Sequence, residues 1–281
     1  IFELNIPDEG KIYSSKVSIN SLETNFGKVT SGIRALQVIN NNNYYVGTVD
    51  GILADKNGIV NKKYQINDQI KDLFSLEDNR VLIVKRSGEL NVLLSDDVTE
   101  KLSEHLSIML DHQITASDVS IAKLQLAVSG GVNKIDFYEL NLNKTLNYAY
   151  TLTFDYLNGN VTALKYLESK NWIVVGSDAG NLVVYSLDDE NVIFNNNNQH
   201  SARITSIAID PSEKLIVTGG RDSKINVWKI DHLKQDYKPI QFKERFIVED
   251  VEFISDNLFV SVTRGQDNDA MGRFNLGRLS L

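Results

Sequence analysis

Short bursts of alternating apolar and polar residues, separated by turn-forming residues, make up most of this chain. The clearest example is the stretch 200–231, where apolar bursts at 204–209, 215–217 and 225–228 are separated by turn residues at 210–212 and 219–222. Alternation with a period of two over such short segments is typical of β-strands. The stretch therefore predicts three strands of an antiparallel meander.

The first burst, Ile204, Ile207 and Ile209, defines a pattern that recurs along the chain. Its copies begin near residues 33, 70, 116, 161, 204 and 248, at steps of 37 to 46 residues. A repeat of roughly 40 to 45 residues is typical of four-stranded β-propeller blades. We therefore expect an all-β propeller, with residues 1–281 as a single domain.

The second half of each unit supports this alignment. Glycine and aspartate turns follow the second strand, as tight hairpins require. The third strand ends in an aromatic residue at the same register in three units: Tyr138, Tyr185 and Trp228. Outer strands are predicted at 60–66, 105–110, 146–154, 192–194 and 240–242. Leucines and methionine in 98–110 also share one helical face, so a short helix is an alternative there.

Residues 1–32 precede the first of these units, and the last unit stops after its third strand. An incomplete blade exposes a strand edge that must be covered. We expect residues 1–6 or 16–22 to pair with the C-terminal blade, and the remaining N-terminal residues to form an incomplete first blade. The expected total is seven blades, and six is the alternative.

The stretch 200–231 resembles one WD40 repeat, in which a histidine opens the unit and a Trp-Asp pair closes it. Here Trp228 is followed by Lys229, with Asp231 nearby. The resemblance implies a structural hydrogen-bond set that links His200, Thr218, Asp222 and Trp228. It also implies a degraded copy at His112, Ser129 and Tyr138, with Val132 in the place of the aspartate. The chain is identified as a divergent member of the WD40 propeller family.

The composition narrows the class of ligand and compartment. The net charge of −8 supplies no excess of cations to neutralise phosphates, so we expect no direct binding of nucleic acid. The absence of cysteine excludes disulfides and thiolate metal sites. No signal peptide or apolar span is recognisable, so we expect a cytoplasmic or nuclear protein without a membrane partner. Asparagine runs at 40–43 and 195–198 are typical of an AT-rich eukaryotic genome, such as that of a fungus.

Catalytic and metal sites are not expected. His200 beside Asp222 and Thr218 could be read as a general base with a nucleophile, but the WD40 resemblance gives all three a structural role. His105 and His112 lack a third ligand at a useful spacing. The glycine pairs lack the spacing and lysine of a phosphate-binding loop. We expect no cofactor, no metal and no enzymatic activity.

Arginines are the candidate binding residues. The repeat alignment places Arg86, Arg203, Arg221 and Arg264 at or near the loop face of the propeller, although four scattered arginines need not form one site. Arginine suits bidentate capture of a carboxylate or phosphate. We therefore expect a protein-interaction scaffold, a subunit of a larger eukaryotic complex, that binds an acidic or phosphorylated peptide. Binding of a phosphoinositide headgroup, suggested by Arg264-Gly265, is the alternative, and an enzyme with a channel-lining site is a third possibility that lacks converging carboxylates.

Overall fold

A computed structural model describes residues 13–14, 33–40, 43–48, 51–56, 59–65, 68–76, 80–96, 101–131, 133–141, 145–197, 199–234, 236–264 and 273–279. In this part of the chain the backbone is mainly antiparallel β-strand, with two short 3-10 helices, η2 (Glu168–Lys170) and η3 (Ile230–His232). Contacts group the chain into two compact units: residues 18–166, here called the N-terminal unit, and residues 1–17 with 167–281, here called the C-terminal unit. No described helix is long and apolar enough to cross a membrane.

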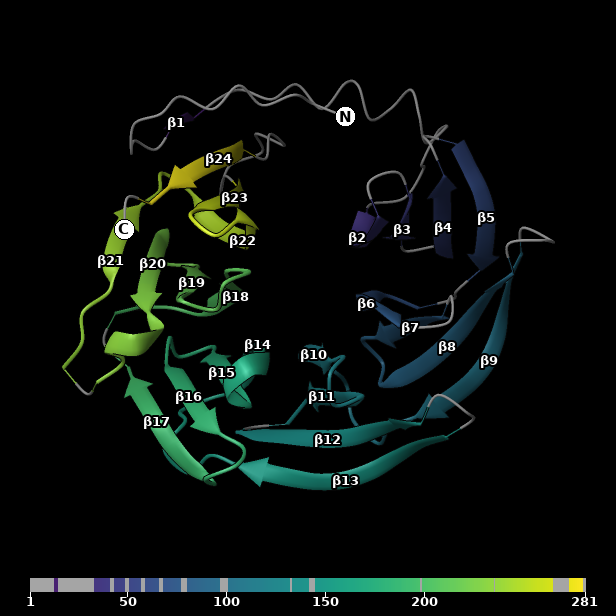
Figure 1. The fold of residues 1–281 in the computed structure, drawn as a ribbon, viewed down its shortest axis with the longest axis horizontal. Coiled ribbons are helices and arrows are strands. Elements are labelled where there is room, and N and C mark those ends of the chain that lie inside the picture. Colours follow the sequence, from purple (N-terminus) through teal and green to yellow (C-terminus); the bar gives the residue numbers. More distant parts are fainter. Residues whose placement is uncertain are drawn as a thin grey trace. The chain divides into compact units, whose positions relative to one another are not determined.

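The described strands form four-stranded sheets in which, apart from β1, neighbours in the chain are neighbours in the sheet (Figure 1). The first three sheets are β2 (Ile33–Asn40), β3 (Asn43–Thr48), β4 (Gly51–Lys56) and β5 (Ile59–Gln65); β6 (Ile70–Leu76), β7 (Arg80–Lys85), β8 (Glu89–Asp96) and β9 (Lys101–Met109); and β10 (Ala116–Ser120), β11 (Gln125–Ser129), β12 (Lys134–Asn141) and β13 (Thr145–Thr153).

Three further sheets follow in the chain. They are β14 (Val161–Leu167), β15 (Trp172–Ser177), β16 (Leu182–Ser186) and β17 (Asn191–Asn196); β18 (Ile204–Ile209), β19 (Leu215–Gly220), β20 (Lys224–Lys229) and β21 (Ile240–Lys243); and β22 (Ile247–Ser255), β23 (Leu258–Arg264) and β24 (Arg273–Arg278), to which β1 (Tyr13–Ser14) adds the fourth strand.

The second strand of a sheet is buried on both faces, which explains its continuous apolar sequence. In β7, Val81 and Ile83 join one hydrophobic cluster, while Leu82 and Val84 join another on the opposite face. Successive side chains of a strand point to opposite faces, so an uninterrupted apolar run is needed where both faces are covered. The core of the N-terminal unit therefore lies between successive sheets.

Two threonines show that the repeat extends to individual hydrogen bonds. Thr115 and Thr205 each precede or begin a first strand, and each hydroxyl lies within hydrogen-bond distance of two backbone carbonyls, one in its own sheet and one in the next. These carbonyls belong to Ser129 and Val161 for Thr115 (2.9 and 2.7 Å) and to Gly219 and Val248 for Thr205 (3.0 and 2.7 Å). Thr115 and Thr205 are thus equivalent residues of the two blades. Because the unit of Thr205 starts one residue earlier, at residue 204, the third unit starts at residue 114, two residues before the predicted start at residue 116.

The predicted all-β propeller class is confirmed, and the predicted outer strands agree with β5, β9, β13, β17 and β21 to within a few residues. The helix considered for residues 98–110 is wrong where the chain is described, because residues 101–109 form β9 and pair with β8. The seven-blade prediction is not confirmed. Six four-stranded sheets occur in the described residues, residues 15–32 lie outside them, and the blade number stays a prediction.

The N-terminal part of the chain does pair with the C-terminal sheet. Tyr13 lies opposite Leu276 and Ser14 opposite Asn275, in an antiparallel pair. The expectation of such pairing is therefore confirmed, but the residues differ from the predicted ones. Residues 1–6 and 16–22, to which the pairing was assigned from their alternation, lie outside the described residues.

Candidate functional site

A buried hydrogen-bond network lies at one end of the sheet β18–β21. His200 Nε2 lies 2.8 Å from Thr218 Oγ1, and His200 Nδ1 lies 3.0 Å from Asp222 Oδ1. Trp228 donates its indole N–H to Thr218 Oγ1 at 3.2 Å. All hydrogen-bonding needs are met when neutral His200 donates from Nδ1 to Asp222 and accepts from the Thr218 hydroxyl at Nε2. The structure thus brings together the four residues that the WD40 resemblance names.

The carboxylate of Asp222 ties this network to the loop before β18. Its second oxygen accepts the backbone N–H of Ser201 at 2.9 Å. Burial acts to raise the pKa of Asp222, but the hydrogen bonds that it accepts from His200 and from the Ser201 N–H outweigh burial, so the pKa lies below the usual value of 3.8. Asp222 is therefore charged at neutral pH and fixes the position of residues 200–201.

Arg203 and Arg221 lie next to each other at this end of the sheet. The backbone N–H of Arg221 donates to the carbonyl of Arg203 at 2.9 Å, directly beyond the last residue pair of β18 and β19, Ile204 with Gly220. Arg221 is exposed and Arg203 is half-buried. Because Asp222 follows Arg221, one arginine is held directly beside the buried network.

The other two candidate arginines have different surroundings. Arg264, at the end of β23, forms an ion pair with Glu249 at 2.8 Å. Arg86 is exposed in the turn between β7 and β8 and belongs to the N-terminal unit. Of the four arginines, the structure places Arg203 and Arg221 in direct backbone contact.

The second histidine set differs from the arrangement implied by the sequence. Leu126 lies opposite Tyr138, and Ile216 lies opposite Trp228, so Leu126 and Ile216 are at equivalent positions. Two residues further along each second strand, the equivalent of Thr218 is therefore Val128 and not Ser129. Ser129 Oγ instead donates to the carbonyl of Lys134. His112 Nδ1 lies 2.8 Å from Asp111 Oδ1, and its Nε2 lies 3.6 Å from Asp136 Oδ2. This site is a histidine between two aspartates and not a copy of the His200 network.

A polar position on the third strand was missed in the sequence. Asn91, Asp136 and Asn226 occupy equivalent positions, each opposite a polar residue of the outer strand. These outer residues are Ser107, Thr151 and Gln241. The signal that could have revealed the position is a single Asn or Asp flanked by apolar residues near the start of these three strands.

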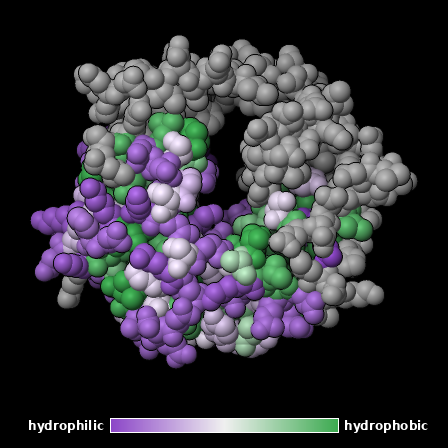
Figure 2. Space-filling view, viewed as in Figure 1, coloured by the Kyte–Doolittle hydropathy of each residue, from purple (hydrophilic) through white to green (hydrophobic). Residues whose placement is uncertain are grey.

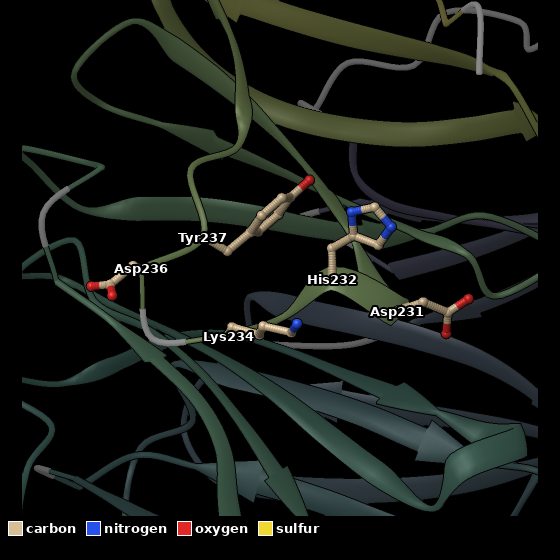
Figure 3. Close-up of a pocket in the computed structure, with 5 residues that line it drawn as sticks. All are labelled: Asp231, His232, Lys234, Asp236 and Tyr237. Carbon is tan, nitrogen blue, oxygen red and sulfur yellow. The ribbon is translucent and has the colours of Figure 1, made fainter.

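An open pocket of about 720 Å³ lies along the connection from β20 to β21. It is lined by Asp231, His232, Lys234, Asp236 and Tyr237 (Figure 3). Asp231 and Asp236 stand at opposite ends, and their carboxylates point away from each other (Figure 3). The Tyr237 hydroxyl accepts the backbone N–H of Lys229 at 3.1 Å, so this side chain anchors the connection. These groups do not converge on a common point where a reaction could occur.

No group of three or more metal-ligating side chains suited to a metal ion occurs in the described residues. The face shown in Figure 2 is largely hydrophilic where it is described, with smaller hydrophobic areas between. The chemistry available at the His200 end of the C-terminal unit is that of a surface with two arginines joined by a backbone hydrogen bond.

Comparisons with known proteins agree with this fold. Residues 193–229 match the family model "WD domain, G-beta repeat". An uncharacterized WD repeat-containing protein of Acanthamoeba polyphaga mimivirus is 24% identical over 221 residues, which cover 76% of this chain and 38% of that protein. The chain thus spans well under half the length of this relative, and a viral relative does not support a fungal origin.

Among solved structures, the computationally designed Ika8 protein is similar, with a TM-score of 0.63 and 20% identity over 88% of this chain and 71% of that one. This similarity concerns the fold alone. Together, the matched repeat and the relative support the resemblance to the WD40 propeller family and, with it, a general role in protein interaction.

Proposed function

We propose that this chain is a non-catalytic protein-interaction scaffold, that it is a subunit of a larger eukaryotic complex, and that Arg203 and Arg221 hold an acidic or phosphorylated peptide of a partner. The observation that carries the proposal is the hydrogen bond from Arg221 N to Arg203 O, which keeps the backbones of two arginines together at one end of the same hairpin. Two adjacent arginines can share the oxygens of one phosphate or of two neighbouring carboxylates.

The loop that carries Arg203 is held from several sides. Lys224 Nζ and Gln241 Nε2 both donate to the carbonyl of Gln199, each at 3.3 Å. Ser201 is bound to Asp222, as described above. A surface that is ordered before binding loses less conformational entropy when a ligand arrives. The network around His200 therefore supports binding without taking part in it.

Arg264 is assigned to the same function as an outlying contributor, and a role for Arg86, which lies in the N-terminal unit, stays a prediction. The ion pair of Arg264 with Glu249 lowers its availability to a ligand, because binding must first break that pair. The headgroup-binding alternative depends on Arg264 and Gly265, and no observation favours it over the peptide.

The proposal is tested with a degenerate phosphoserine and phosphothreonine peptide library and its unphosphorylated counterpart. We expect the double substitution Arg203→Glu with Arg221→Glu to abolish retention of the phosphorylated library while the melting temperature stays unchanged. The matched control is Lys214→Glu with Lys234→Glu, which reverses two exposed charges at the other end of the same sheet. Equal retention by both variants would refute the assignment of the arginines.

The scaffold role is tested separately. A tagged chain purified from its source at physiological salt should carry other proteins in fixed stoichiometry. A chain that runs alone at every salt concentration would contradict the proposed place in a complex.

A further inference from the structure

Apolar side chains of two outer strands of the N-terminal unit, β9 and β13, lie over one buried cluster. Figure 1 shows these two strands at the outer edges of neighbouring sheets. Leu106 and Ile108 of β9 pack against the same buried cluster as Tyr138 of β12 and Leu146 of β13. All four side chains remain partly exposed. Tyr148, whose ring contacts that of Tyr138 with centroids 5.8 Å apart, is 60% exposed. We call this surface the β9–β13 groove.

The corresponding junction between the sheets β14–β17 and β18–β21 is sealed. There Phe194 of β17 lies 5.4 Å from Trp228, and the two side chains are 2% and 0% exposed. Leu106 lies opposite Val92, which in turn lies opposite Leu82, the third residue of β7. Phe194 lies opposite Val184, which lies opposite Val174, the third residue of β15. Leu106 and Phe194 are therefore at equivalent positions of their sheets. Tyr138 likewise occupies the register of Trp228. Smaller or more polar residues at both positions leave the groove open.

Negative charge lies beside this groove. Asp111 and Asp136 flank His112, and the Asp111 side chain is 99% exposed. Burial, followed by the charges of Asp136 and Asp111, raises the pKa of Tyr138 to about 12. The Tyr138 hydroxyl thus lies in a negative potential, which an incoming cation would relieve.

We propose that the β9–β13 groove binds a short segment of a partner protein that places a leucine- or phenylalanine-sized side chain against Leu106, Tyr138 and Tyr148 and a neighbouring lysine or arginine near Asp111 and Asp136. Partly exposed apolar side chains of this kind gain free energy when a ligand side chain covers them. The carboxylates select the flanking cation and orient the segment.

The charge of the chain argues for this occupant over a second copy of the protein. Each copy carries a net charge of −8, so two copies repel at long range, whereas a cationic segment is attracted. The groove lies in the N-terminal unit, and Arg203 and Arg221 lie in the C-terminal unit. The inference therefore does not depend on the arginine site, and variants of one leave the residues of the other unchanged.

The experiment selects a phage-displayed library of random dodecapeptides on the full chain and measures the enriched peptides by fluorescence polarisation. We expect enriched sequences that combine a large apolar residue with a nearby lysine or arginine. Tyr148→Ala should weaken their binding about tenfold or more, because exposed aromatic anchors dominate such interfaces. Asp111→Asn should weaken it about threefold at low salt and less at high salt.

Two further variants separate the groove from its surroundings. Tyr148→Phe keeps the ring but removes the hydrogen bond to Thr151 (3.0 Å), so it should bind as the wild type does. Tyr156→Ala removes another exposed tyrosine of the same unit, outside the groove, and should leave binding unchanged. Failure to enrich any peptide, enrichment of acidic peptides, or equal loss in Tyr156→Ala would each overturn the proposal. So would a dimer in light scattering that Tyr148→Ala dissociates, because the occupant would then be a second copy.

Discussion

Replacing Thr218 with valine tests the network at the centre of the sheet β18–β21. The substitution keeps the shape of the side chain but removes the hydroxyl that contacts His200 Nε2 at 2.8 Å and Trp228 Nε1 at 3.2 Å. The Trp228 N–H and the His200 nitrogen then have no partner in a site where Thr218 and Trp228 are 0% exposed. Each buried polar group left without a partner costs about 1–3 kcal/mol, so for the two groups we expect a loss of roughly 2–6 kcal/mol in the free energy of unfolding.

The loss is measured by thermal and urea unfolding followed by circular dichroism. Each kilocalorie shifts the melting temperature by about 2–4 °C for a chain of this size, so a drop of at least about 4 °C is expected. Thr218→Ser should recover most of the loss because it restores the hydroxyl. Thr153→Val, at an exposed strand position, is the matched control and should change the stability by at most about 0.5 kcal/mol. If Thr218→Val unfolds no earlier than Thr153→Val, the hydroxyl does not support the network as described.

Two other substitutions probe the same physical picture. The pKa of Asp222 is lowered in the folded protein, so its charge stabilises the fold above the unfolded pKa of about 4, and this stabilisation is lost as the pH falls through the lower folded pKa. The difference in melting temperature between the wild type and Asp222→Asn should therefore shrink between pH 7 and pH 3. A difference that stays constant over this range would contradict the role given to the Asp222 charge. Gly130→Ala would place a Cβ 1.5 Å from the Gln113 carbonyl oxygen, whereas the same change at Gly131 meets nothing within 4 Å. The first variant should lose more than about 2 kcal/mol of stability and the second should melt near the wild type, as compared by differential scanning fluorimetry.

Strand positions could be predicted from the sequence because they depend on local alternation. Tyr138, Tyr185 and Trp228 do lie at one register, each opposite the second residue of the second strand. The strand at residues 101–109 was ambiguous, since its leucines fit helical and extended periods alike. Pairing with β8, a tertiary effect, decides it.

The candidate site was only partly accessible from the sequence. The partners of His200 lie 18 and 22 residues away, and only the family resemblance connected them. The alignment of Ser129 with Thr218 was wrong, because register depends on pairing between strands, which the order of residues in one strand does not reveal. The β9–β13 groove was not predicted at all, since it arises from the packing of strands in different sheets.

The pairing of β1 with β24 has a consequence for biosynthesis. The two strands are separated by more than 250 residues, so this pair of strands cannot form until β24 has left the ribosome. Joining such distant segments carries a large loop-closure entropy and is slow compared with hairpin formation. Until then the outer edge of β24 is open to pairing with other chains. A chain that lacks residues 13–14 would keep that edge exposed throughout its lifetime, and its defect would be aggregation during expression.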